Sequence, residues 1–101
     1  MSSDSNISGS GNTATGDHSM YSNTTGGEST AIGSYALYFN TTGSENIAIG
    51  YRAAYSNTDG TTNTALGHYS LYTNSNGDNN VAIGNKAGYS ATGDRNVLCF
   101  V

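Results

Sequence analysis

Residues Thr30–Asn46 read TAIGSYALYFNTTGSEN, and the next segment, Ile47–Asn63, reads IAIGYRAAYSNTDGTTN. Both segments place Ala, Gly, Tyr, Asn, Gly and Asn at the same positions of a 17-residue unit. Self-similarity at a fixed short period is the signature of a repeat architecture, in which every unit is one structural element that stacks on the next. The period of this unit is therefore the strongest constraint on the fold.

The same unit can be followed outward over the whole chain of 101 residues, which we predict to form a single domain, 1–101. The successive units are a partial unit 1–12, the full units 13–29, 30–46, 47–63 and 64–80, a unit 81–96 that is one residue short, and a partial unit 97–101. The seventeen residues of the two partial units together make one complete unit.

Several positions of the unit hold the same kind of residue throughout the chain. The second position is alanine: Ala14, Ala31, Ala48, Ala65 and Ala82. The third is mostly a large apolar residue: Ile32, Ile49, Leu66 and Ile83. The fourth is glycine, and the ninth is tyrosine: Tyr21, Tyr38, Tyr55, Tyr72 and Tyr89. Asparagine and a second glycine follow, as in Asn40 and Gly43. This regularity disfavours a disordered Ser/Asn/Gly linker.

The unit is too short for a helix pair or a propeller blade, and it suits one coil of an all-β parallel β-solenoid. We expect two short strands and two turns per coil, with both glycine columns supplying positive φ at the corners. Stacking at about 4.8 Å would turn the Asn and Tyr columns into ladders. We also expect the column of Ile32 and Ile49 to point inward as an internal ladder.

Composition narrows the classes of partner. Apolar residues make up 35% of the chain, below the usual share of about 45–50%, so a large core is not available. Only three basic residues and a net charge of −4 argue against nucleic acid. No apolar run approaches membrane-spanning length, so we expect no membrane insertion. The first residues show no signal peptide.

A thin solenoid with two or three sizeable apolar side chains per coil buries little surface alone, so we expect a homo-oligomer. A trimer is a natural arrangement. The assembly interface is predicted at the alanine column, Ala14, Ala31, Ala48, Ala65 and Ala82. The alternative is that this column lines a tight inner corner of one chain.

The C-terminal segment is the most apolar part of the chain and carries no charge or proline that would block a strand edge. We predict that it belongs to the assembly interface, as an uncapped joint that the next molecule's residues 1–12 complete: Val97, Leu98, Cys99, Phe100 and Val101. Alternatively, it folds over the last coil as a cap. Cys99 cannot form an internal disulfide because it is alone, and its column predicts a buried thiol.

No catalytic, cofactor or metal constellation is evident. His18 and His68 occupy variable positions, and Gly-Asp pairs such as Gly77-Asp78 lack the calcium-repeat pattern. Three sequons are candidate glycosylation sites, although Asn-Thr-Thr-Gly is also good turn chemistry. They are Asn6, Asn23 and Asn40. The tyrosine ladder is either a carbohydrate platform or, as we favour, packing.

The core unit, with Ala-Ile-Gly at 31–33, 48–50 and 82–84, resembles the head repeats of trimeric autotransporter adhesins of the YadA type. It also resembles the "TAIGYxALYxNTTGxN" repeats of phage and viral tail fibres. The resemblance implies a left-handed parallel β-roll that trimerises and has adhesive or fibre-building roles. The unit here is longer than in those adhesin heads generally, and the stalk and anchor of the adhesins do not appear.

The combined expectation is a structural protein, not an enzyme, that assembles with itself head to tail into an extracellular or virion-associated fibre. One alternative is an adhesin head or fibre tip that binds a cell-surface glycan or receptor. A second alternative is an ice-binding solenoid, although the Thr-x-Thr ladder expected for that function is missing, because Thr24-Thr25 and Thr41-Thr42 are adjacent and give way to Ser75-Asn76.

Overall fold

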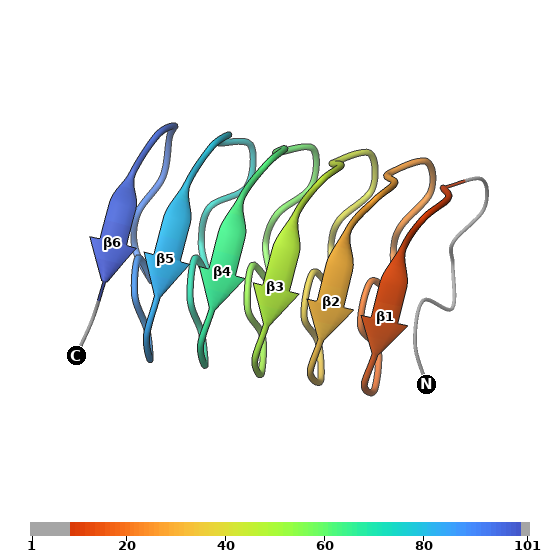
Figure 1. Ribbon diagram of the computed structural model, residues 1–101, viewed down its shortest axis with the longest axis horizontal. Coiled ribbons are helices and arrows are strands. Elements are labelled where there is room, and N and C mark those ends of the chain that lie inside the picture. The colour runs from red at the N-terminus through yellow and green to blue at the C-terminus, as the bar shows by residue number, and fades with distance from the viewer. Residues whose placement is uncertain (1–8, 100–101) are drawn as a thin grey trace.

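In a computed structural model that describes residues 9–99, the chain is a parallel β-solenoid, as the period predicts. Figure 1 shows the coils side by side, with one strand of each on a common face. The described residues contain six strands: β1 (Thr13–Thr15), β2 (Thr30–Ile32), β3 (Ile47–Ile49), β4 (Thr64–Leu66), β5 (Val81–Ile83) and β6 (Val97–Cys99). They form one sheet in the order β1-β2-β3-β4-β5-β6.

The register of the strands follows the repeat. Ala31 pairs with Ala48, and Ile32 pairs with Ile49, with every strand parallel to its neighbours. The one-residue deletion in coil 81–96 does not disturb this order, because Val81 still pairs with Val97. The parallel solenoid with a spacing of 17 residues that the repeat predicts is therefore confirmed.

Each coil has one strand, so the expectation of two strands per coil is wrong. The remainder of each coil is a series of turns in which non-glycine residues adopt positive φ, for example Tyr35 at 64°, Leu37 at 51° and Glu45 at 59°. A left-handed residue cannot continue an extended strand, so the return path of the coil is broken into short turns.

The strand side chains that point inward are the alanines. Ala31, Ala48 and Ala65 are fully buried within a single chain, where Leu37 and Leu71 from the opposite wall join them in the core. The interior is narrow: a Cβ on Gly88 would come within 2.9 Å of the Leu98 side chain. Only a small side chain fits on the inner side of the strand.

The predicted internal ladder of large residues is wrong for the same reason. Successive residues of a strand point to opposite sides, so an inward second residue turns the first and third residues outward. Ile32, Leu66 and Ile83 are accordingly 39%, 41% and 42% exposed.

Asparagine ladders fill the other part of the interior, as predicted. Asn57 donates its amide N–H to Asn40 Oδ1 at 2.8 Å and to Gly60 O at 3.1 Å. A second ladder links Asn46 and Asn63, because Asn46 Oδ1 accepts the Asn63 backbone N–H at 2.9 Å. Both ladders satisfy buried amides, so a polar interior carries no penalty for unmade hydrogen bonds.

The two glycine columns serve different needs. Gly33 and Gly50 have φ of 126° and 128°, so this column supplies positive φ as expected. Gly26 and Gly43 lie in the turns, as predicted, but without positive φ. Glycine is required there because a Cβ on Gly26 would lie 2.2 Å from the carbonyl oxygen of Gly43 in the next coil.

Candidate functional site

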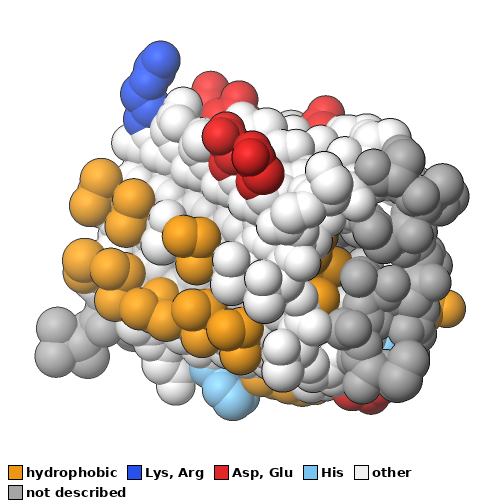
Figure 2. Space-filling view, turned by 45° about the vertical axis from the view of Figure 1, so that its right-hand side comes forward, with side chains coloured by type: hydrophobic (Ala, Val, Ile, Leu, Met, Phe, Trp, Pro, Cys, Tyr) orange, Lys and Arg blue, Asp and Glu red, His pale blue; other side chains and the backbone are white. Residues whose placement is uncertain are grey.

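The outward side of the strands forms an apolar surface that we call the sheet face. It consists of the side chains of the first and third residues of the six strands: Thr13, Thr15, Thr30, Ile32, Ile47, Ile49, Thr64, Leu66, Val81, Ile83, Val97 and Cys99. Its hydrophobic side chains form two rows across the strands in Figure 2. Ile47 is 42% exposed and Val97 75% exposed. Large apolar side chains gathered on one face of a protein mark a surface for interaction.

The alanine column is not this surface, so its assignment to the assembly interface is wrong. Four of its members have no exposed area in the single chain, namely Ala31, Ala48, Ala65 and Ala82. Ala14, at the first strand, is partly buried against the same core. The alternative prediction, an inner wall of the coil, is the correct one. The recurrence of a small residue, alanine, at the same strand position of every unit was the sequence signal for this inner wall.

The C-terminal segment divides between the two sides of the sheet. Leu98 continues the alanine column and packs partly buried against the core. Val97 and Cys99 lie on the sheet face, and the predicted interface residues Phe100 and Val101 lie outside the described residues. The Cys99 thiol is exposed, so the prediction of a buried thiol is wrong, because its column points outward.

The strands at the two ends of the described sheet have one partner each. Strand β1 pairs with β2, and β6 pairs with β5, so each presents one edge with unpaired backbone groups. Residues 9–12 stack on coil 13–29 as the end of a preceding unit. Gly9 donates its N–H to Thr24 O at 3.1 Å, and Asn12 Oδ1 accepts the Ser29 N–H at 3.0 Å.

The sequons do not offer accessible asparagines where the structure describes them. Asn23 and Asn40 are fully buried, and the Asn40 amide donates to Asn23 Oδ1 at 2.9 Å. Glycosylation at these two positions is therefore wrong as a prediction, and the turn-chemistry alternative holds. The third candidate, Asn6, lies outside the described residues.

The tyrosine ladder is a packing feature. Consecutive rings from Tyr21 to Tyr89 stack nearly parallel, with centroids 4.9–5.4 Å apart. The inner rings cover one another's faces, whereas Tyr89 at the end of the ladder is 37% exposed. The guanidinium of Arg52 lies over Tyr55 at 5.1 Å. Burial raises the pKa of Tyr55, an effect that the Arg52 charge opposes.

The histidines lie apart from one another along the aromatic side of the coils. His18 stacks on Tyr35 with a centroid distance of 5.2 Å, and His68 is exposed. Within residues 9–99, no group of three or more His, Cys, Asp or Glu side chains could hold a metal ion. That part of the chain also contains no helix long and apolar enough to cross a membrane.

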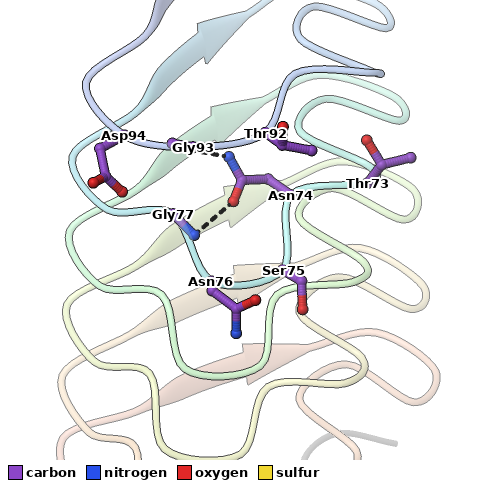
Figure 3. Close-up of a pocket in the computed structure, with 8 residues that line it drawn as sticks. All are labelled: Thr73, Asn74, Ser75, Asn76, Gly77, Thr92, Gly93 and Asp94. Carbon is purple, nitrogen blue, oxygen red and sulfur yellow. Dashed lines mark hydrogen bonds between the residues drawn. The ribbon is translucent and has the colours of Figure 1, made fainter.

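A cavity of about 240 Å³, lined by polar residues and two glycines, lies between coil 64–80 and the shortened coil 81–96. Its lining comprises Thr73, Asn74, Ser75, Asn76, Gly77, Thr92, Gly93 and Asp94. Figure 3 shows Asn74 at its centre, bridging the two coils. No signal in a single unit predicts this cavity, but the missing residue of unit 81–96 marks its place.

Comparison of the chain with protein-family models, curated proteins and solved structures gives no match.

Proposed function

We propose that this protein is a structural subunit that associates through its sheet face and stacks head to tail into a fibre. The observation that carries the proposal is the outward row of large apolar side chains, of which Ile32, Leu66 and Ile83 are about two-fifths exposed. Covering each of them would contribute about 1–2 kcal/mol. Repetition along the sheet makes the contact cumulative.

A closed homotrimer fits the shape of this surface. The sheet face is a narrow strip that runs along the solenoid, and three such strips can meet around one axis with equivalent contacts. The alanines then remain inside each chain, and the apolar rows of the three chains form the core between them. The resemblance to adhesin heads and tail fibres also favours a trimer, and it favours a location outside the cell or on a virion.

Head-to-tail growth is supported by the strand edges. The free edge of β6 offers unpaired backbone groups in the same register that β5 already uses, and β1 offers the complementary edge. Pairing β6 of one subunit with β1 of another continues the parallel ladder without a change of geometry. An edge of this kind is a template for addition of a further strand.

The sheet-face interface is tested by Leu66→Glu, which places a charge among the apolar rows. By analytical ultracentrifugation we expect this variant to be a folded monomer and the unmodified protein to be a trimer. Thr62→Glu is the matched control, because Glu28 and Glu45 occupy the same exposed position of earlier units; it should leave the trimer intact. A Leu66→Glu protein that still trimerises would contradict the proposal.

The joint is tested separately by deleting Val97–Val101. We expect folded trimers that do not elongate into filaments in electron micrographs. Long filaments formed by this truncated protein would show that the joint lies elsewhere.

Ice binding is a second candidate for the same face. The sheet face is repetitive, and Thr13 and Thr15 bracket Ala14 as an outward Thr-x-Thr pair, with Thr30 and Thr64 in the same rows. Thermal hysteresis of the monomeric protein would favour this function over assembly, because a trimer would cover the surface that ice must contact.

A further inference from the structure

The cavity beside the shortened coil lies at a turn that lacks a backbone acceptor present in the first coils. In coil 13–29, the N–H groups of Thr24, Thr25 and Gly26 all point to a single oxygen, Thr41 O, at 3.0–3.1 Å. The next coil repeats the pattern, with three N–H groups 2.9–3.2 Å from Thr58 O. Three consecutive N–H groups around one oxygen form a backbone nest, and here the following coil fills the nest.

In coil 47–63 only the Thr58 N–H reaches the facing oxygen, Ser75 O, at 2.9 Å, and in coil 64–80 none of the three N–H groups reaches an oxygen of the next turn among residues 9–99. Coil 81–96 is one residue short in the facing turn and has Ala91 where the earlier coils have asparagine. The N–H groups of Ser75 and Asn76 have no acceptor among residues 9–99, and the Gly77 N–H donates to Asn74 Oδ1 of its own turn at 2.9 Å.

The hydrogen bonds of Asn74 also differ from those of the other asparagines in its ladder. Asn23, Asn40 and Asn57 each donate an amide N–H to the glycine carbonyl of their own turn, at 3.0–3.1 Å. Asn74 instead donates to Gly93 O of the next coil at 3.1 Å, as the dashed line in Figure 3 shows. Its amide now spans the gap that the deletion opens.

The cavity also contains an acceptor. Asp94 lines it, and one carboxylate oxygen accepts the Asp78 N–H at 2.8 Å, which leaves the second oxygen for a further donor. A ligand must therefore supply an acceptor to the nest and a donor to the carboxylate. A hydroxyl group does both. An anion would be repelled by Asp94, and a cation would face the N–H groups of the nest.

We propose that this cavity binds a neutral saccharide unit, whose hydroxyl groups accept from Ser75 and Asn76 N–H and donate to Asp94. The volume of about 240 Å³ is below the roughly 300–1,000 Å³ of pockets for drug-sized ligands, so it suits one sugar ring. The cavity belongs to a single chain, so binding does not depend on the proposed assembly. In a fibre the sites would repeat, and avidity would strengthen attachment to a glycan surface.

The test is an NMR titration of the ¹⁵N-labelled full chain with methyl α-D-glucopyranoside, methyl β-D-galactopyranoside and N-acetylglucosamine, each used separately. We expect saturable shifts of the Ser75, Asn76 and Gly77 amides with at least one sugar and a Kd on the order of 1 mM. The amides of Thr24, Thr25 and Gly26 serve as internal controls because Thr41 O already fills their nest. The absence of saturable shifts with all three sugars would overturn the proposal.

Two further probes separate the competing ligands. Sodium acetate tests a simple anion site, and N-acetylglycine methylamide tests a peptide site. Neither should shift the Ser75 and Asn76 amides, and saturable binding of either in place of the sugars would overturn the saccharide assignment.

A restored coil is the matched variant. Ala91→Asn with a threonine inserted between Thr92 and Gly93 recreates the turn of coil 30–46 and its capping carbonyl. This variant should keep the β circular dichroism spectrum and lose sugar binding. Asp94→Asn should weaken binding about tenfold or more, because a hydrogen bond to a charged acceptor is lost. Undiminished sugar affinity in the restored coil would place the ligand elsewhere.

Discussion

The two sides of the same strand behave in opposite ways. On the inner side, Ala48 is fully buried between its in-register neighbours, Ala31 and Ala65. On the outer side, the larger Ile32 and Leu66 are about two-fifths exposed. Side-chain hydrophobicity alone would have reversed this arrangement. The difference teaches that the width of the coil, and not the size of the apolar group, decides which side of the strand is the core.

The largest expected effect comes from enlarging the inner side. Ala48→Leu adds three carbon atoms where Ala31, Ala65 and the opposite wall already fill the space, and we expect a loss of about 3 kcal/mol or more in the free energy of unfolding. Urea denaturation monitored by circular dichroism measures it. Ile49→Leu, one residue along on the outer side, is the control and should cost less than about 1.5 kcal/mol. Equal losses of stability in Ala48→Leu and Ile49→Leu would show that the two sides of the strand do not differ in packing.

A second test addresses the polar part of the same interior. Asn57→Ala removes the amide that links Asn40 Oδ1 and Gly60 O, so we expect a loss of about 2 kcal/mol in the free energy of unfolding. Asn76→Ala is the control, because Asn76 is an exposed residue whose amide donates to the exposed Asp59 and the half-buried Thr58. Its effect should stay within about 0.5 kcal/mol. A small cost at Asn57 would mean that the ladder is dispensable.

A third change acts on the outer side alone. Ile32→Thr reproduces at the third strand position the residue that Thr15 already supplies in β1. In the monomer we expect the free energy of unfolding to fall by about 1 kcal/mol or less, because Ile32 is already 39% exposed. The same change should weaken association measurably by analytical ultracentrifugation. A monomer destabilised as strongly as by Ala48→Leu would show that the outer row is also core.

The smallest effect is a chemical probe of exposure that leaves stability unchanged. The Cys99 thiol is exposed, so we expect it to react with a thiol reagent at the rate of a small-molecule thiol in monomeric protein. Assembly should protect it, because it lies in the same outward column as Ile83. Slow labelling of the monomer, measured by absorbance, would place Cys99 on the inner side.

Much of the fold was predictable because residues at equivalent positions of successive repeats pair with one another. Once Ala31 and Ala48 are aligned at a separation of 17 residues, the strand pairs, the stacked tyrosines and the asparagine ladders follow from equal spacing. The cavity was predictable only as an irregularity. The shortened unit was visible, but which N–H groups lost their acceptor depended on how the turns of two coils meet.

The sequence by itself determined the period, the solenoid, the parallel register and the ladders, because these properties depend only on which residues recur. It also determined that the two sides of each strand differ. The tertiary structure alone decided which side is inside, since alternation along a strand is symmetrical between the two choices. The opposite wall removed that symmetry: residues such as Leu37 and Leu71 already occupy the narrow interior, so alanine faces inward and isoleucine is left on the surface.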